Sequence, residues 1–234
     1  MTREDEVTVF LVHTDQSKAV TDRLARHLDA RESQRAEAIR DHSGRSRFVV
    51  AHGAMREIVA ERLSVRPAEI RWHEGPNGKP SLESELRVNL STGGAAALVA
   101  LTWHRDVGVD IEPLPSELVA TRLASRHFPA AQACYVAEGP TPDEIAARFT
   151  TLWSRKEACV KAHGGRLSQG MALAVDGVTP ICLPFPADAE DGVVRVHDLP
   201  APPGHRAAVA LTGAAPFDVF HRVWDPETEA GTDG

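Results

Sequence analysis

The sequence predicts an α+β fold built from two similar lobes with a cleft between them. Each half of the chain contains a long stretch of helical periodicity followed by short stretches of strand periodicity. The segment RFVVAHGAMREI (47–58) can also be laid loosely beside RFTTLWSRKEAC (148–159), which indicates an internal duplication. At 234 residues the chain is long enough for one large domain or two small ones with hydrophobic cores of their own.

The composition is that of a globular protein, and it narrows the range of partners. Hydrophobic residues make up 42% and charged residues 25% of the chain. The net charge of −7 argues against broad nucleic-acid binding, because a duplex-binding surface carries a basic excess. The N-terminus has acids where a signal peptide has bases, and its apolar run is too short for a bilayer, so we expect neither export nor a membrane anchor. Three cysteines without metal-ligand spacing favour a reducing, cytoplasmic compartment.

In the first half, the apolar pattern predicts a strand, a set of helices and then more strands. Ser17 can cap the first helix, and the apolar residues of the last helix recur at the spacing of a buried stripe. The elements expected here are, in order, a strand at 7–13, helices at 17–30, from about 32 and at 45–63, a turn at 75–80 (GPNGKP), and strands at 86–90, 96–103 and 107–112.

The second half repeats this style around one long helix. Thr141 as N-cap, Pro142 as first residue and Glu144 as the third residue after the cap predict a capping box, and Gly164 and Gly165 supply a left-handed end. The elements expected here are helices at 116–128, 129–138 and 142–163, a closing antiparallel set of strands at 193–197, 206–211 and 217–224, and a disordered tail at 225–234.

The stretch VGVDIEP (107–113) reads as a strand with an apolar face and an acidic face. Its alternation places Asp110 and Glu112 on the same side, roughly 6 to 7 Å apart. Two such charges repel by about 2.5 kcal/mol at an effective dielectric near 20. One interpretation is a solvated strand end, where water screens the repulsion. The other is a magnesium site, in which a third carboxylate and phosphate oxygens complete an octahedral shell.

The long helix offers a candidate third carboxylate. Trp153, Glu157 and Lys161 stand four residues apart and share a face. The pair Glu157 and Lys161 is also a common surface arrangement that stabilises a helix by only about 0.2 to 0.5 kcal/mol. Lys156 adds a cation on the adjoining face.

Two further segments could bind phosphate. Lys79 lies in the GPNGKP turn, and VNLSTGG (88–94) ends a strand in two hydroxyls and two glycines. A lysine in a turn is usually only solvated, and VNLSTGG could equally be a plain strand-to-strand turn. A GxxxxGK[ST] motif is absent from the sequence, which argues against a P-loop nucleotide site, and no serine lies in a nucleophile elbow.

Taken together and in order, GPNGKP, VNLST, VGVDIEP and FTTLWSRKEACVKAHGGRL resemble the 4′-phosphopantetheinyl transferase superfamily. The resemblance is to its larger two-lobed branch, the surfactin-synthetase-activating or Sfp type, which activates carrier domains of peptide and polyketide synthases. It covers about residues 45–168. It implies two α+β lobes in a pseudo-twofold arrangement, over 1–108 and 109–224, with coenzyme A and magnesium bound in the cleft between them.

The resemblance also implies the site residues. The metal ligands would be Asp110, Glu112 and Glu157, and the catalytic groups Glu157, Lys161 and Asp110. The coenzyme-binding residues would be Arg47, Lys79, Pro80, Ser91, Thr92, Asp110, Lys156 and Lys161, with Arg35 as further charge for the 3′-phosphate. Gly108 would keep the acidic face clear for pyrophosphate.

The implied reaction transfers the phosphopantetheine arm to a carrier-protein serine and releases adenosine 3′,5′-bisphosphate, with magnesium and Lys161 offsetting charge and Glu157 as candidate base. Two positions depart from the family pattern. Thr92 stands where a histidine is usual, and a hydroxyl carries no positive charge. Gln132 stands where a glutamate is usual.

These departures motivate a second hypothesis, a catalytically weakened relative that binds carrier domains as a module. A third, a magnesium phosphotransferase acting on a small molecule, would need a nucleotide motif that the sequence lacks. We expect acidic carrier domains and coenzyme A as partners, no nucleic acid, no membrane, and a monomer, since one duplicated chain builds the whole site.

Overall fold

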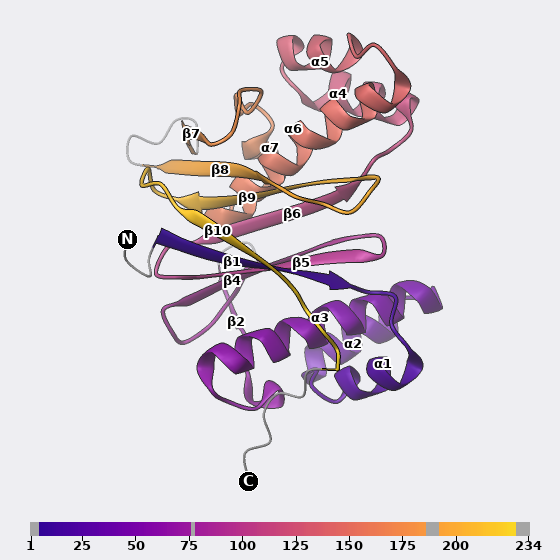
Figure 1. Ribbon diagram of the computed structural model, residues 1–234, viewed down its shortest axis with the longest axis vertical. Helices are drawn as coiled ribbons and strands as arrows, with labels where there is room; N and C mark the ends of the chain where they lie inside the picture. Colours follow the sequence, from indigo (N-terminus) through magenta and orange to yellow (C-terminus); the bar gives the residue numbers. More distant parts are fainter. Residues whose placement is uncertain (1–4, 76–77, 186–191, 228–234) are drawn as a thin grey trace.

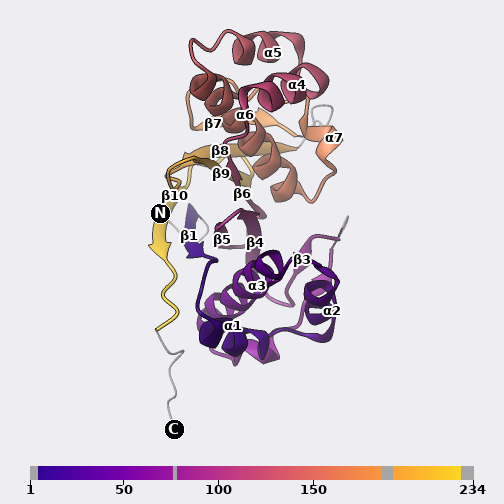
Figure 2. The ribbon, with the colours of Figure 1, turned by 90° about the vertical axis from the view of Figure 1, so that its right-hand side faces the viewer.

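In the computed structural model, which describes residues 5–75, 78–185 and 192–227, the chain forms two α+β lobes that pack against each other. Figure 2 shows the helices α1 to α3 on one lobe and α4 to α7 on the other, with the strands between them. No helix in the described part of the chain is long and apolar enough to cross a membrane. The α+β prediction is confirmed.

The first lobe holds a four-stranded sheet covered on one side by three helices (Figure 1). The strand order is β10-β1-β5-β4, and β1, β5 and β4 pair antiparallel. The elements of this region are β1 (Glu6–His13), α1 (Lys18–Ala25), α2 (Ala30–Ala38), α3 (His42–Leu63), a short 3-10 helix (Pro67–Glu69), β2 (His73–Glu74), β3 (Pro80–Ser81), β4 (Leu86–Gly93) and β5 (Ala96–Trp103).

The second lobe holds another four-stranded sheet, and α6 lies across it. The strand order is β6-β9-β8-β7, antiparallel throughout. The elements of this region are β6 (Val107–Pro113), α4 (Glu117–His127), α5 (Ala130–Ala137), α6 (Pro142–His163), α7 (Leu167–Gly170), β7 (Ile181–Pro184), β8 (Val193–Leu199) and β9 (His205–Thr212). The predicted strands at 193–197 and 206–211 are confirmed.

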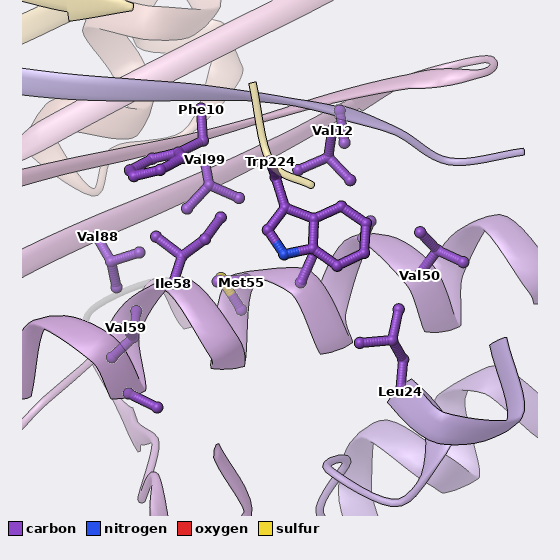
Figure 3. Packing of buried hydrophobic residues seen from close by; sticks show 14 of the residues in the cluster. Phe10, Val12, Leu24, Val50, Met55, Ile58, Val59, Val88, Val99 and Trp224 are labelled. Atoms are coloured by element: carbon purple, nitrogen blue, oxygen red, sulfur yellow. The ribbon is translucent and has the colours of Figure 1, made fainter. Parts of the chain in front are cut away.

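The last strand, β10 (Asp218–Val223), corrects the predicted closing antiparallel set. It leaves the second lobe and pairs parallel with β1, at the edge of the first sheet. Trp224 then enters the core between α3 and that sheet, where Figure 3 shows it among Val12, Val50 and Met55. Its Nε1 donates to Glu57 Oε2 at 3.3 Å. Strand β10 and Trp224 therefore return to the first lobe, whose core offers an apolar place for the indole.

Three apolar clusters hold the layers together. One lies between α3 and the first sheet, one between α6 and the second sheet, and one between the two sheets. The apolar face of β6, with Val107, Val109 and Ile111 all 0% exposed, belongs to the cluster between the sheets. The acidic face of β6 consequently points toward α6.

Gly108 lies on that same face, and the structure gives it a different use from the predicted one. A Cβ there would lie 2.1 Å from Ala158 O and 2.2 Å from Ala162 N, both in α6. Glycine is needed because the helix backbone packs directly on the strand. Gly108 leaves room on this face of β6 for the backbone of α6, and the prediction that it leaves room for pyrophosphate was wrong.

The ends of α6 were largely predictable. Thr141 caps the helix by accepting from Glu144 N at 3.2 Å, and Gly164 ends it at a φ of 68°. The Glu144 side chain pairs with Arg148, so among the described contacts only half of the capping box is present. The predicted lobe division after residue 108 falls inside β6. Of the predicted tail, residues 228–234 lie outside the described part, and Pro226 O accepts from Arg23 Nη2 at 3.0 Å.

Candidate active site

The centre of the candidate site is a buried carboxylate on β6 that meets a lysine on α6. Asp110 is 0% exposed, and its Oδ1 accepts from Lys161 Nζ at 2.6 Å and from Ser91 Oγ at 2.9 Å. Lys161 Nζ also donates to Ser91 Oγ at 3.0 Å. Asp110 Oδ2 is buried without a hydrogen-bond partner in the described part of the chain. The interpretation of VGVDIEP as a solvated strand end is therefore wrong.

Two more carboxylates, Glu112 and Glu157, lie near this pair, and their surroundings disfavour the ionised form of each. Burial, and then the charge of Asp110, raise the pKa of Glu112 to about 7. Burial also raises the pKa of Glu157, and Asp110 adds to that rise while Lys161 opposes it. Three carboxylates thus face one ammonium group. Such an excess of negative charge in a partly buried site favours binding of a cation.

The chemistry of these groups fits a magnesium ion. All three side chains are carboxylates, the oxygen ligands that magnesium prefers, and the unpaired Asp110 Oδ2 is a free acceptor among them. As they stand, no three acidic, histidine or cysteine side chains of the described residues form a ready metal cluster. The metal set consequently stays a proposal, and Lys161 is the group that holds Asp110 Oδ1.

Beside the acidic site, the first lobe contains a cavity of about 550 Å³. It lies between α3 and β4, and the predicted residues Arg35, Arg47, Pro80 and Thr92 are among its lining. Arg47 Nε also donates to Asp15 Oδ1 at 2.7 Å. Two guanidinium groups at one cavity suit a phosphorylated ligand.

Sequence reasoning missed an aromatic pair in this cavity. The rings of Phe48 and His52 stack with centroids 4.0 Å apart, and Arg35 Cζ lies 5.3 Å from the Phe48 ring centroid. Both rings line the cavity. Their spacing of four residues on α3 could have indicated a shared face. Because that stripe is also typical of a core, the sequence did not separate the two uses.

Lys79 does not line the cavity, although its neighbours Gly78 and Pro80 do. Its Nζ donates to Ala162 O at 2.8 Å, at the C-terminal end of α6, and lies 3.5 Å from Asp106 Oδ1. Burial lowers the pKa of Lys79. The lysine therefore bridges the two lobes in this structure. Pro76 and Asn77 of the same turn lie outside the described residues.

Lys156, predicted to bind coenzyme, is instead directed away from the acidic site and into the core of its own lobe. It is 0% exposed, and its Nζ donates to Met171 O at 2.7 Å and Leu173 O at 2.6 Å. The Phe128 ring centroid lies 5.1 Å from the same nitrogen. On a helix, residues 156 and 157 point in different directions, and only Glu157 is directed toward the acids.

Gln132 is a structural residue of the second lobe. It is 4% exposed, and its Nε2 donates to Leu173 O at 3.0 Å and Asp176 Oδ1 at 2.9 Å. A glutamate could not donate these bonds. The Nε2 group thus has two acceptors that an ionised carboxylate could not serve, whereas Oε1 is buried without a partner among the described residues.

Comparison with known proteins agrees with this geometry. A family model described as the 4′-phosphopantetheinyl transferase superfamily matches residues 106–184, the region that carries Asp110, Glu157 and Lys161. The chain is 32% identical over 171 residues to the 4′-phosphopantetheinyl transferase HetI of Nostoc sp., and the match covers 70% of this chain and 71% of that protein. This chain belongs to the 4′-phosphopantetheinyl transferase superfamily.

Two further relatives of this superfamily member extend the comparison. It is 31% identical over 132 residues to the 4′-phosphopantetheinyl transferase AcpT of Salmonella typhimurium, covering 56% of this chain and 66% of that protein. It is 24% identical over 161 residues to the 4′-phosphopantetheinyl transferase ffp of Bacillus subtilis, covering 68% and 69%. The chain is a transferase enzyme of this class, and the resemblance noted from its motifs is confirmed.

Proposed function

We propose that this phosphopantetheinyl transferase moves the 4′-phosphopantetheine arm of coenzyme A to a serine of an apo acyl- or peptidyl-carrier domain and releases adenosine 3′,5′-bisphosphate. The observation that carries the proposal is the Asp110–Lys161 pair, with its unpaired oxygen and two further carboxylates, beside a cavity with two arginines. Anionic and cationic groups placed together in this way suit a metal-bound pyrophosphate. Family membership supports the same reaction.

Asp110, Glu112 and Glu157 would hold the magnesium ion. Bound there, the ion would supply positive charge to the pyrophosphate oxygens and to the leaving group. Lys161 carries a second positive charge at the same place, because its ammonium is already fixed between Asp110 and Ser91. A preorganised cation needs little rearrangement as charge develops on the leaving phosphate.

Glu157 is the candidate general base. The serine oxygen would form a bond to the β-phosphorus while the bond from that phosphorus to the bridging pyrophosphate oxygen breaks. The bridging oxygen would leave on adenosine 3′,5′-bisphosphate, and the serine proton would pass to the Glu157 carboxylate. A base works best when its pKa lies near the operating pH, and burial raises the pKa of Glu157 in that direction.

The cavity of the first lobe is the proposed coenzyme site. Arg35 and Arg47 supply charge for a phosphate, and Thr92 supplies a hydroxyl. His52 lines the same wall and could offset the missing histidine at position 92, since both side chains reach this cavity. The carrier domain, the monomeric state and the cytoplasmic location expected from the sequence stay predictions.

The deciding experiment incubates the protein with coenzyme A, magnesium and several apo carrier domains, and weighs each carrier by mass spectrometry. We expect a carrier heavier by one phosphopantetheine arm, with transfer abolished by EDTA and restored by excess magnesium. Unchanged mass on every carrier would refute the enzymatic proposal, and binding without transfer would favour the carrier-binding module.

The role of Glu157 has its own test. Glu157→Gln keeps the shape of the side chain but removes the proton acceptor, so we expect the rate of transfer to fall by about 10²- to 10⁴-fold. Glu144→Gln, on the exposed first turn of the same helix, is the matched control and should transfer at the wild-type rate. Unchanged turnover in Glu157→Gln would overturn the assignment.

A further inference from the structure

The contact between β4 and β6 joins the two lobes, and side chains of β4 supply two of its hydrogen bonds. β4 is an edge strand of the first sheet and β6 an edge strand of the second. An edge strand presents backbone N–H and C=O groups that its own sheet leaves unpaired. Here Val109 N donates to Asn89 Oδ1 at 2.9 Å, and Ile111 N donates to Ser91 Oγ at 3.3 Å. The side chains of one edge thus satisfy the amides of the other.

The row on β4 is continued by a glycine. Asn89, Ser91 and Gly93 alternate along the strand and so share a face. A Cβ at Gly93 would lie 2.6 Å from Ile111 O, so at this third position the two backbones approach directly. His205 Nε2, from β9, lies 3.1 Å from Gly93 O. At the junction, the Asn89 amide group and the Ser91 hydroxyl accept hydrogen bonds from β6. At Gly93 the backbones of the two strands are in direct contact.

Asn89 and Ser91 differ in their relation to the acidic site. Ser91 Oγ also contacts Asp110 and Lys161, so any change there alters the site directly. The Asn89 side chain bonds to none of these groups, and its Oδ1 holds the amide of the residue just before Asp110. Asn89 is 9% exposed and is part of the lining of the 550 Å³ cavity. Asn89 therefore contacts both the cavity and β6, the strand that carries the acids.

We propose that Asn89 is a positioning residue for the transfer reaction: by holding the Val109 amide, it fixes Asp110 and Glu112 relative to the coenzyme cavity. The inference rests on the proposed function, since it takes the cavity as the coenzyme site. A buried amide that loses its acceptor is driven to find water or to move. Transfer between groups held on two lobes is sensitive to shifts of about 1 Å.

The test compares Asn89→Ala with Thr102→Ala. Thr102 is 2% exposed on β5, and its Oγ1 donates to Glu6 O at 2.9 Å, so its loss removes one partly buried side-chain bond of the same sheet away from the junction. We expect similar decreases in melting temperature for both variants. Only Asn89→Ala should speed amide exchange of the 107–113 peptide, by about tenfold, and lower kcat by about tenfold or more while the Kd for coenzyme A changes by less than about threefold.

Asn89→Asp provides the rescue, because a carboxylate oxygen can accept the same N–H. It should restore exchange protection to within about threefold of wild type, and exchange alone is the measure of this rescue because the added charge lies beside Asp110. Full kcat in Asn89→Ala despite rapid exchange, or an equal loss of kcat in Thr102→Ala, would overturn the proposal. If the wild-type protein modified no carrier, the proposed function would fail, and the exchange comparison would still decide whether Asn89 holds β6.

Discussion

The helices α3 and α6 are both 22 residues long, and each buries a cation at the same distance from its first residue. In α3, Arg56 is 0% exposed and bonds to Glu32 at 2.6 Å and Asp29 at 2.7 Å. In α6, Lys156 is equally buried but bonds only to backbone carbonyls among the described residues. One turn further along α6, three carboxylates face Lys161. The carboxylates around Arg56 thus balance its charge, whereas the carboxylates around Lys161 outnumber the ammonium group they face.

This difference separates structural charge from functional charge. Burying a charge costs several kcal/mol unless a partner offsets it, so a fold that leaves acids uncompensated loses stability there. In this protein the uncompensated acids lie where a cation and a phosphate would complete the balance. Four substitutions test the contrast between balanced and unbalanced charge, and they are given from the largest expected effect to the smallest.

Removal of the balanced cation should have the largest effect on stability. Arg56→Met leaves the buried Glu32 without its guanidinium partner, and we expect the free energy of unfolding to fall by about 3–5 kcal/mol. Urea denaturation measures it. The control is Arg66→Met, whose pair with Glu69 is exposed (82% and 47%), and which should leave the free energy of unfolding nearly unchanged. Equal losses in the two variants would show that the Arg56 network contributes no more than a surface pair.

Removal of an unbalanced acid should affect chemistry instead of stability. Asp110→Asn keeps an oxygen for Lys161 and relieves repulsion with Glu112, so we expect unchanged or higher stability and a transfer rate lower by about 10²- to 10³-fold. Single-turnover transfer and urea unfolding measure the two quantities. Asp198→Asn, which weakens a pair with Arg155 elsewhere on the lobe, is the control and should transfer normally. A strongly destabilised Asp110→Asn would mean that the acid is structural.

Most of the secondary structure was predictable because its causes are local. The alternation of Val107, Val109 and Ile111 places one face of β6 in a core, and Thr141 and Gly164 mark the ends of α6 by their own conformational preferences. The order of VNLST, VGVDIEP and the α6 motif likewise located Asp110 and Lys161, because each motif lies on a single element.

What the sequence did not reveal depends on contacts between distant segments. Strand periodicity does not name a partner, so the parallel pairing of β10 with β1 was missed. Gly108 looked open from its strand alone, and only α6 packing shows its use. Lys156 and Glu157 are adjacent in the motif, yet the helix turns one into the core and the other toward the acids.

The unpaired cation of α6 predicts a pH dependence of stability. Burial lowers the pKa of Lys156 to about 8, from an ordinary value of 10.5. Between these values the unfolded chain binds more protons than the folded one, so stability rises as the pH increases. Relative to Lys156→Met, the wild type should gain on the order of 2 kcal/mol between pH 8 and pH 10. Urea unfolding across this range measures it, and a constant difference would place Lys156 in a solvated environment.

The smallest effect is expected at the exposed end of α3, where Arg47 pairs with Asp15. The two side chains are 38% and 61% exposed, so water screens the pair and it contributes little to stability. If Arg47 binds a coenzyme phosphate as proposed, Asp15 would compete for its guanidinium group, and Asp15→Asn should tighten coenzyme A binding by up to about fivefold in calorimetric titration. Asp22→Asn, which makes the same charge change in the exposed pair with Lys18, should leave the Kd unchanged. Weaker binding in Asp15→Asn would show that Asp15 orients Arg47 toward the cavity, as Asp29 and Glu32 orient Arg56 in the core.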